Sequence, residues 1–254
     1  MMKPQPETAA VVDILAFGAH PDDVELAASG TLVRAARAGA KTGVITLTRG
    51  EMGTRGTLAM RAAEFDAAAA IIGVSHHEML SLPDGRLTVD EASREAVIRE
   101  IREHRPRVIL LPYWEDRHPD HPAASRIIEE AAFLAGLPKR DTGQEPHRPS
   151  QLVYYMSTWE FDPSFIVDVS GVIEDKRRTL QAYETQLFKP GAAGAAVATK
   201  EPPTYIASEQ FHELLFARMA HYGHLIGKKY GEPFKIRGHL EVADLLETFG
   251  QRTF

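Results

Sequence analysis

The 254-residue sequence has no cysteine, no dense run of lysine or arginine, and no long apolar segment. Without cysteine there are no disulfides, thiolate metal sites or cysteine nucleophiles, so a bound metal must rely on histidine and carboxylate. The formal net charge of −6 argues against a nucleic-acid partner, which requires clustered cations. The apolar stretch beginning at Val11 contains Asp13 and is too short for a membrane span or a secretory signal. We therefore expect a cytoplasmic protein with no membrane partner.

Apolar residues make up 44% of the chain and charged residues 25%, which is typical of a globular protein. Short apolar runs alternate with segments of helical periodicity, and this predicts an α/β fold with a Rossmann-like, mostly parallel sheet flanked by helices. We expect a single domain over residues 1–254, in which 1–135 form the core with the motifs and 136–254 complete the domain and the substrate cleft. The strands are predicted at 11–17, 42–48, 78–82, 108–111 and 152–156, and the helices at 24–39, 57–72, 90–104, 172–188 and 209–228.

Two short motifs hold most of the residues with catalytic chemistry. Ala19-His20-Pro21-Asp22-Asp23 follows the first predicted strand, and Arg117-His118-Pro119-Asp120-His121 follows the strand that ends near residue 111. Ligands gather beyond the carboxyl ends of parallel strands, so we expect the two motifs to share one site. Histidine and carboxylate suit zinc and related divalent ions, and a catalytic zinc keeps three protein ligands and one open position. The sequence therefore predicts a catalytic metal centre.

Each motif alone also has an ordinary structural explanation. Asp22 or Asp23 could cap the following helix with His20 as a polar loop residue, and a histidine pair in a loop is usually incidental. Two matching strand-to-helix junctions argue against coincidence. If His20, Asp23 and His121 hold an ion, Asp22 and His118 remain beside it. A metal lowers the pKa of a coordinated water to about 7 and polarises a carbonyl. Asp22 would accept the proton of the water, and His118 would stabilise the oxyanion or protonate the leaving amine.

Two alternatives remain open from the residues alone. A non-catalytic Rossmann-like binding domain would share the strand and helix alternation, although Gly18-Ala19-His20 is not the glycine-rich loop that such domains use for a pyrophosphate. The metal is also open, because histidine and carboxylate accept iron, manganese or cobalt as well as zinc.

Gly18-Ala19-His20-Pro21-Asp22-Asp23 with His118-Pro119-Asp120-His121 resembles the LmbE-like, or PIG-L, zinc-dependent N-acetylglucosamine deacetylases, whose fold is Rossmann-like. Three further stretches are similar to the branch that removes acetate from N-acetylglucosaminyl malate in bacillithiol biosynthesis: Tyr183-Glu184-Thr185-Gln186, Tyr222-Gly223-His224-Leu225-Ile226-Gly227 and Tyr230-Gly231-Glu232-Pro233-Phe234. The resemblance covers nearly the whole chain. It implies one zinc per chain, a small amino-sugar substrate and a homo-oligomer, with a hexamer as one form. The alternative substrates are chitobiose-type, mycothiol-type and glycopeptide sugars.

The resemblance also implies a role for each residue of the metal site. The implied zinc ligands are the three residues named above: His20, Asp23 and His121. Asp22 would be the general base and His118 the oxyanion or acid group. Asp120 and Arg148 would support His118 as neighbours that tune it, since metal sites generally require such partners.

Substrate contacts follow from the same resemblance. Arg61 matches the family's sugar-binding arginine, although by itself it would be an ordinary arginine on a helix face. Glu51 and Arg55 lie in a segment that resembles the family's substrate loop, and Tyr205 stands where related enzymes have a mobile tyrosine near the oxyanion. The Gly- and Ala-rich segment 189–203 is expected to be a surface loop, either a lid or a plain connector.

Overall fold

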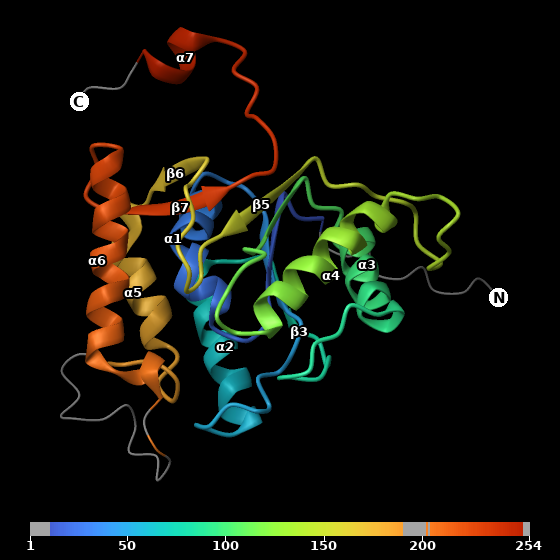
Figure 1. Ribbon diagram of the computed structural model, residues 1–254, viewed down its shortest axis with the longest axis horizontal. Coiled ribbons are helices and arrows are strands. Elements are labelled where there is room, and N and C mark those ends of the chain that lie inside the picture. Colours follow the sequence, from blue (N-terminus) through green and yellow to red (C-terminus); the bar gives the residue numbers. More distant parts are fainter. Residues whose placement is uncertain (1–10, 190–201, 203, 251–254) are drawn as a thin grey trace.

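The computed structural model describes residues 11–189, 202 and 204–250, and within them seven strands form one sheet in the order β3-β2-β1-β4-β5-β7-β6 (Figure 1). Five strands are parallel: β1 (Ile14–Gly18), β2 (Thr42–Thr46), β3 (His76–Met79), β4 (Val108–Pro112) and β5 (Gln151–Tyr155). The other two complete the sheet, and β7 is antiparallel to both of its neighbours: β7 (Gly231–Lys235) and β6 (Phe165–Asp168). The predicted α/β class with a mostly parallel sheet is confirmed.

Helices cover both faces of the sheet (Figure 1). One face packs against four helices: α1 (Asp23–Arg37), α2 (Leu58–Ile72), α5 (Ile173–Gln181) and α6 (Glu209–Leu225). The other face packs against two helices: α3 (Glu91–His104) and α4 (Asp120–Ala135). In β1, Ala16 faces the first layer, whereas Leu15 and Phe17 face the second, and all three are fully buried. Burial on both faces explains why the central strands read as continuous apolar runs.

Local signals place several helix ends where the sequence predicts them. The Thr57 hydroxyl accepts the N–H of Met60 at the start of α2, and Gly73, with a φ of 79°, ends the helix. The Asp90 carboxylate accepts the N–H of Ser93 at the start of α3. These are ordinary N-cap and C-cap arrangements.

The second half of the chain departs from the prediction. The helix predicted at 172–188 ends at Gln181, and the next residues form turns in which the backbone N–H of Thr185 binds the Glu64 carboxylate. Strands β6 and β7 were not predicted, since Pro233 inside β7 argues against a strand. Pairing of β7 with β5 involves only Phe234 and Lys235, so Pro233 lies beyond this ladder and has a strand partner on one side alone, Ile166 of β6.

The chain order creates a crevice between β1 and β4. From β1 the chain adds β2 and β3 on one side and then returns to place β4 on the other side. Neighbouring crossovers diverge at such a switch point, and ligands bind there beyond the carboxyl ends of the strands. The first motif follows β1 and the second follows β4, so the topology brings both to this crevice.

Both predicted parts of the chain contribute to the sheet. Strands from both predicted parts, 1–135 and 136–254, join one sheet, while the single-domain organisation stays a prediction. No helix in the described ranges is long and apolar enough to cross a bilayer. The loop predicted at 189–203 falls largely outside the described residues. The remaining elements are short: η1 (Ser170–Val172), η2 (Tyr205–Ala207) and α7 (Leu245–Phe249).

Candidate active site

A tight turn presents the first motif at the start of α1. The Asp23 carboxylate accepts the backbone N–H of His20 at 2.9 Å, which closes the turn. Gly18 allows it, because a Cβ there would lie 3.0 Å from the His20 carbonyl oxygen. Asp22 has a φ of 106°, a left-handed conformation that is unfavourable for a residue with a Cβ. Strain of this kind is concentrated at functional sites.

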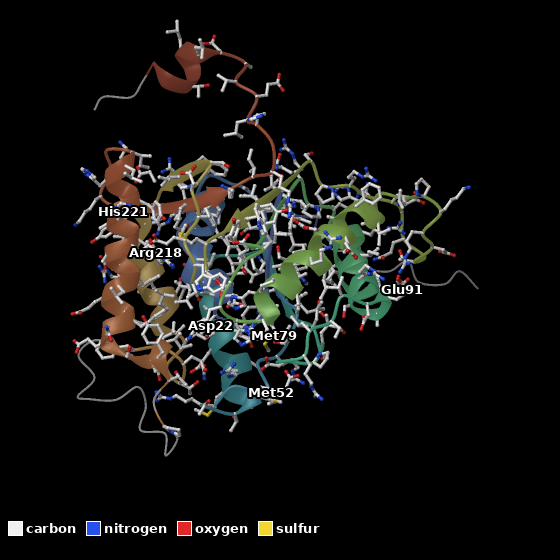
Figure 2. All side chains as sticks on the ribbon, viewed as in Figure 1. Asp22, Met52, Met79, Glu91, Arg218 and His221 are labelled. Atoms are coloured by element: carbon white, nitrogen blue, oxygen red, sulfur yellow. The ribbon has the colours of Figure 1, made fainter. Side chains whose placement is uncertain are left out.

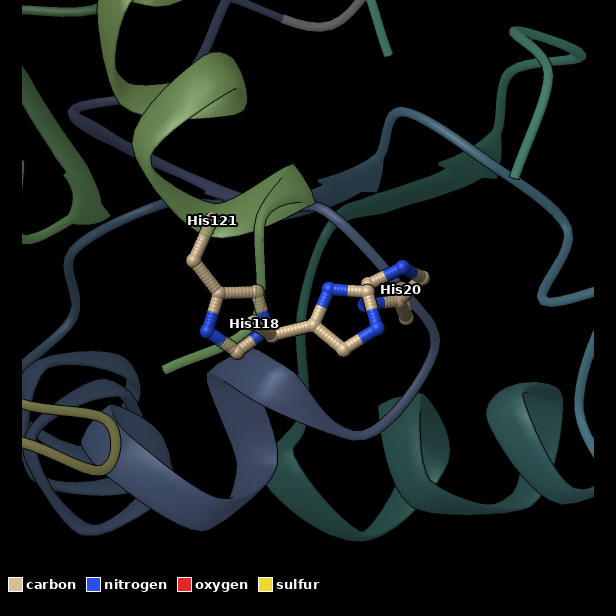
Figure 3. Close-up of side chains that lie close together, drawn as sticks. All are labelled: His20, His118 and His121. Carbon is tan, nitrogen blue, oxygen red and sulfur yellow. The ribbon is translucent and has the colours of Figure 1, made fainter. Parts of the chain in front are cut away.

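Three histidines from the two motifs meet at this turn (Figure 3). The His20 ring centroid lies 4.6 Å from that of His118 and 5.5 Å from that of His121. Asp23 lies between two of them, since its carboxylate oxygens are 3.5 Å from His20 Nδ1 and 3.2 Å from His121 Nε2. The structure thus brings together the three predicted ligands, with Asp22 and His118 beside them.

Carboxylates lie behind both of the predicted histidine ligands. His20 Nε2 is 3.1 Å from Asp84 and 3.2 Å from Asp120, and His121 Nδ1 is 3.2 Å from Asp116. Histidines that bind metals are commonly oriented by a carboxylate on their second nitrogen. Residues Asp84 and Asp116 were missed by sequence reasoning. Asp84 falls a few residues beyond the end of β3 and Asp116 a few beyond β4, and that position at the carboxyl edge was the available signal.

Of the two predicted supports of His118, Asp120 acts through its backbone instead of its side chain, and Arg148 lies elsewhere. The Asp120 side chain binds His20 and the backbone N–H groups of residues 85 and 87, and only its own backbone N–H reaches His118, donating to Nδ1 at 3.2 Å. Arg148 is exposed and lies beyond the other end of α4, where it donates to the Phe133 carbonyl and lies over its ring. The length of α4 separates Arg148 from the histidines, so it does not tune His118.

Close packing of opposite charges perturbs the titration of the cluster. Burial would lower the pKa of His20, but hydrogen bonds to three carboxylates outweigh it and raise the pKa well above its ordinary value. For His121 the carboxylates also outweigh burial, and the pKa rises to about 9. Burial and the charge of Asp23 raise the pKa of Asp22 to about 8. Burial and the two neighbouring histidines lower the pKa of His118. His20 and His121, whose pKa values are raised, therefore carry the protons that a metal would displace.

A cavity of about 870 Å³ opens above the histidines. Arg61 and Tyr205 both line it, as do His118 and Asp22. Arg61 is 7% exposed and donates to Gln186, and the backbone of the 50–53 loop approaches it so closely that a Cβ on Gly50 or Gly53 would lie 2.0 Å from its guanidinium. These glycines make room for the arginine.

The two other predicted substrate contacts lie outside the described lining of this cavity. Glu51 accepts the backbone N–H of Asp84 at 2.8 Å, and Arg55, 5% exposed, accepts the side-chain N–H of Gln186 on its carbonyl at 2.6 Å. Both residues brace the loop instead of facing substrate. Met52, which lies between them, lines the cavity.

The donor set fits a divalent ion. The Asp23 carboxylate lies 3.5 Å from His20 Nδ1 and 3.2 Å from His121 Nε2, and the second nitrogen of each imidazole faces a carboxylate. The rings of His20, His118 and His121 are also close enough together to hold an ion. Two imidazoles and one carboxylate with an open cavity on the remaining side are the ligands and access of a catalytic site. Such a set also accepts several first-row metals.

Comparisons with known proteins identify the family. The family model described as PIG-L, GlcNAc-PI de-N-acetylase, matches residues 15–132. The diacetylchitobiose deacetylase of Thermococcus kodakarensis is 31% identical over 69% of this chain and 70% of its own length. The chain belongs to the PIG-L family. It is also similar to the 1D-myo-inositol 2-acetamido-2-deoxy-alpha-D-glucopyranoside deacetylase 2 of Catenulispora acidiphila, with 28% identity over 81% of this chain and 89% of the relative.

A conserved protein of Thermus thermophilus has the same fold, with a TM-score of 0.82 and 34% identity over 92% of this chain and 99% of its own. The predicted family is therefore confirmed. The two relatives named as enzymes are deacetylases of different sugars, so the family assignment leaves the substrate of this chain to be proposed.

Proposed function

We propose that this chain is a metal-dependent N-deacetylase that hydrolyses the acetamide of an N-acetylglucosamine conjugate. The observation that carries the proposal is the convergence of His20, Asp23 and His121, with Asp22 beside them, at the base of a cavity in a PIG-L family chain. These three side chains would hold one divalent ion, with zinc as the family-based choice. When bound, the ion would supply Lewis acidity and lower the pKa of water.

Asp22 is the base in this proposal. Its side chain is buried and lines the cavity next to the proposed ligands, so it can accept a proton from the attacking water and return it to the leaving amine. Burial and the charge of Asp23 raise the pKa of Asp22, to about 8, and the attraction of a bound cation acts in the opposite direction. A bound cation would thus favour the ionised carboxylate that a base requires.

His118 donates a hydrogen bond to the developing oxyanion. Because the Asp120 N–H donates to its Nδ1, the ring proton of neutral His118 resides on Nε2. The lowered pKa of His118, caused by burial and two neighbouring histidines, keeps the ring neutral. A fixed neutral donor favours oxyanion stabilisation over the protonation of the amine, the two roles that the sequence left open.

For the substrate we propose an N-acetylglucosamine unit next to Arg61, with N-acetylglucosaminyl malate as the specific conjugate. The shared glucosamine unit is supported by the names of both deacetylases, and the malate by the similarity of the segments around Gln186 and Tyr230 to that branch. Chitobiose-type, inositol-linked and glycopeptide sugars are the alternatives. The expected homo-oligomer and cytoplasmic location stay predictions.

The test is acetate release from a panel of N-acetylglucosamine conjugates that includes the malate, diacetylchitobiose and the inositol glycoside. We expect release from at least one conjugate, its loss on chelation, and its recovery on adding zinc. About one metal per chain should accompany activity. If the chain instead purifies with a nucleotide and no metal, and releases no acetate, the binding-domain alternative replaces the deacetylase.

A further inference from the structure

Arg218 is the feature of the cavity that the proposed catalytic machinery does not use. It lies on α6, which lines the cavity together with the start of α1, and Figure 2 labels it beside α6. One guanidinium nitrogen donates to the Ser157 carbonyl at 2.5 Å. The N–H of the next residue, Thr158, binds Asp116, the carboxylate behind His121. The 157–158 segment therefore connects Arg218 to the proposed metal site.

Within the described part of the chain, no carboxylate forms an ion pair with Arg218. Burial lowers its pKa, and Glu160 and Asp116 attract it only from longer range. Two other half-buried arginines, Arg140 and Arg94, do have glutamate partners. Arg218 is half-buried, and a charge that is partly removed from water is costly unless it is paired. Its guanidinium faces a cavity that is open to ligands.

A second cation lies on the same cavity. Arg117 is exposed, and its guanidinium carbon lies 6.0 Å from the ring centroid of Tyr205, which also lines the cavity. His221 lies one turn after Arg218 on α6 and also lines the cavity, although no sequence pattern assigned it a function. Glu160 lines the same region and opposes an anion, but it is exposed, so solvent screens it.

We propose that Arg218, assisted by Arg117, binds a carboxylate on the group attached to the N-acetylglucosamine unit of the substrate. The planar guanidinium matches a carboxylate with two parallel hydrogen bonds, and the pair is strongest where water is excluded. The inference rests on the proposed function and deepens it, since it selects conjugates with an anionic aglycone, such as a hydroxy dicarboxylate, over neutral disaccharides and inositol glycosides.

The test compares Arg218→Met with wild type on two substrates, N-acetylglucosaminyl malate and neutral diacetylchitobiose. Loss of a hydrogen bond to a charged group should lower kcat/KM for the malate about 10- to 100-fold, mainly through KM. The value for diacetylchitobiose should fall by a much smaller factor, because a neutral aglycone offers no charge to Arg218 and only the lost hydrogen bond to Ser157 acts on it. Arg218→Lys should recover part of the loss. Arg126→Met, which removes a cation that is 62% exposed on α4, is the matched control and should leave both substrates unaffected.

An equal loss on both substrates would overturn the inference, because it would place Arg218 against the shared sugar or in a purely structural role. Unchanged kinetics on both would overturn it as well. If wild type deacetylates no conjugate of the panel, the proposed function fails, and binding then decides the inference separately. N-acetylglucosaminyl malate should raise the melting temperature of wild type but not of Arg218→Met, and equal shifts or no shift would refute the anion subsite.

Discussion

Replacing Lys176 with methionine should destabilise the fold strongly, because it breaks a fully buried ion pair. Lys176 Nζ lies 2.6 Å from the Glu232 carboxylate, and the two side chains are 0% and 1% exposed. The ammonium also donates to the Leu26 carbonyl at 2.9 Å. Glu232 accepts further hydrogen bonds from Gly30 and Thr31, so it ties α1, which begins at the proposed metal ligands, to α5 and β7.

In Lys176→Met the Glu232 carboxylate keeps its hydrogen-bond donors but loses its cation. Removing one partner of a buried pair costs about 3–5 kcal/mol of unfolding free energy. For a chain of this size, each kcal/mol lowers Tm by about 2–4 °C, so we expect a decrease of roughly 6–20 °C. Methionine preserves most of the volume of the side chain, so little of this cost comes from a cavity.

Urea and thermal unfolding, monitored by circular dichroism, measure this cost. Lys41→Met is the control, since this lysine is exposed and its loss should change stability by less than about 0.5 kcal/mol. Lys176→Met combined with Glu232→Gln should be more stable than Lys176→Met alone, because no uncompensated charge then remains. A single variant within about 1 kcal/mol of wild type, or a double variant that loses more than the single, would refute the reasoning.

The proposed site is tested by three measurements. Asp22→Asn should lower kcat about 10²- to 10⁴-fold at unchanged metal content, because asparagine tolerates the positive φ but cannot act as a base. A parallel loss of metal would instead identify Asp22 as a ligand. Asp84→Asn weakens the support of His20 and should lower metal affinity about 10- to 100-fold in chelator competition, whereas unchanged affinity would confine Asp84 to a loop role. Nearby carboxylates outweigh burial and raise the pKa of His121 to about 9, so the metal-free ring is protonated at neutral pH and metal binding must release that proton. Metal affinity should thus fall as pH falls, and calorimetry in buffers of different ionisation enthalpy should detect the release; binding without proton release would contradict the assignment.

Much of the fold follows from short-range patterns in the sequence. The caps at Thr57 and Asp90 and the glycine after α2 act within a single turn, so the helix ends they set are visible in the sequence. The carboxyl ends of parallel strands lie at one edge of the sheet. For this reason, two motifs about a hundred residues apart could be predicted to form one site. The positions of His20, Asp23 and His121 followed from it.

The partners of those residues depended on packing between distant segments. His20 and Asp120 are 100 residues apart, and neither Asp84 nor Asp116 belongs to a recognisable motif. Asp120 is directed to His20 instead of His118 because the backbone N–H groups of residues 85 and 87 hold its carboxylate. The role of Arg148 was implied by the family resemblance alone, and the length of α4 separates this residue from the histidines.

By itself, the sequence determined the α/β class, the family and the chemical types gathered at the crevice, because these depend on local periodicity, turn chemistry and motif composition. Only the tertiary structure decided which carboxylates support the histidines and how β7 enters the sheet despite Pro233. It also decided that Arg218 faces the cavity with no counter-ion among the residues that the structure describes. The physical reason is that burial and charge pairing are properties of the packed molecule. The sequence alone cannot distinguish an arginine that faces a cavity from an ordinary arginine on a helix surface.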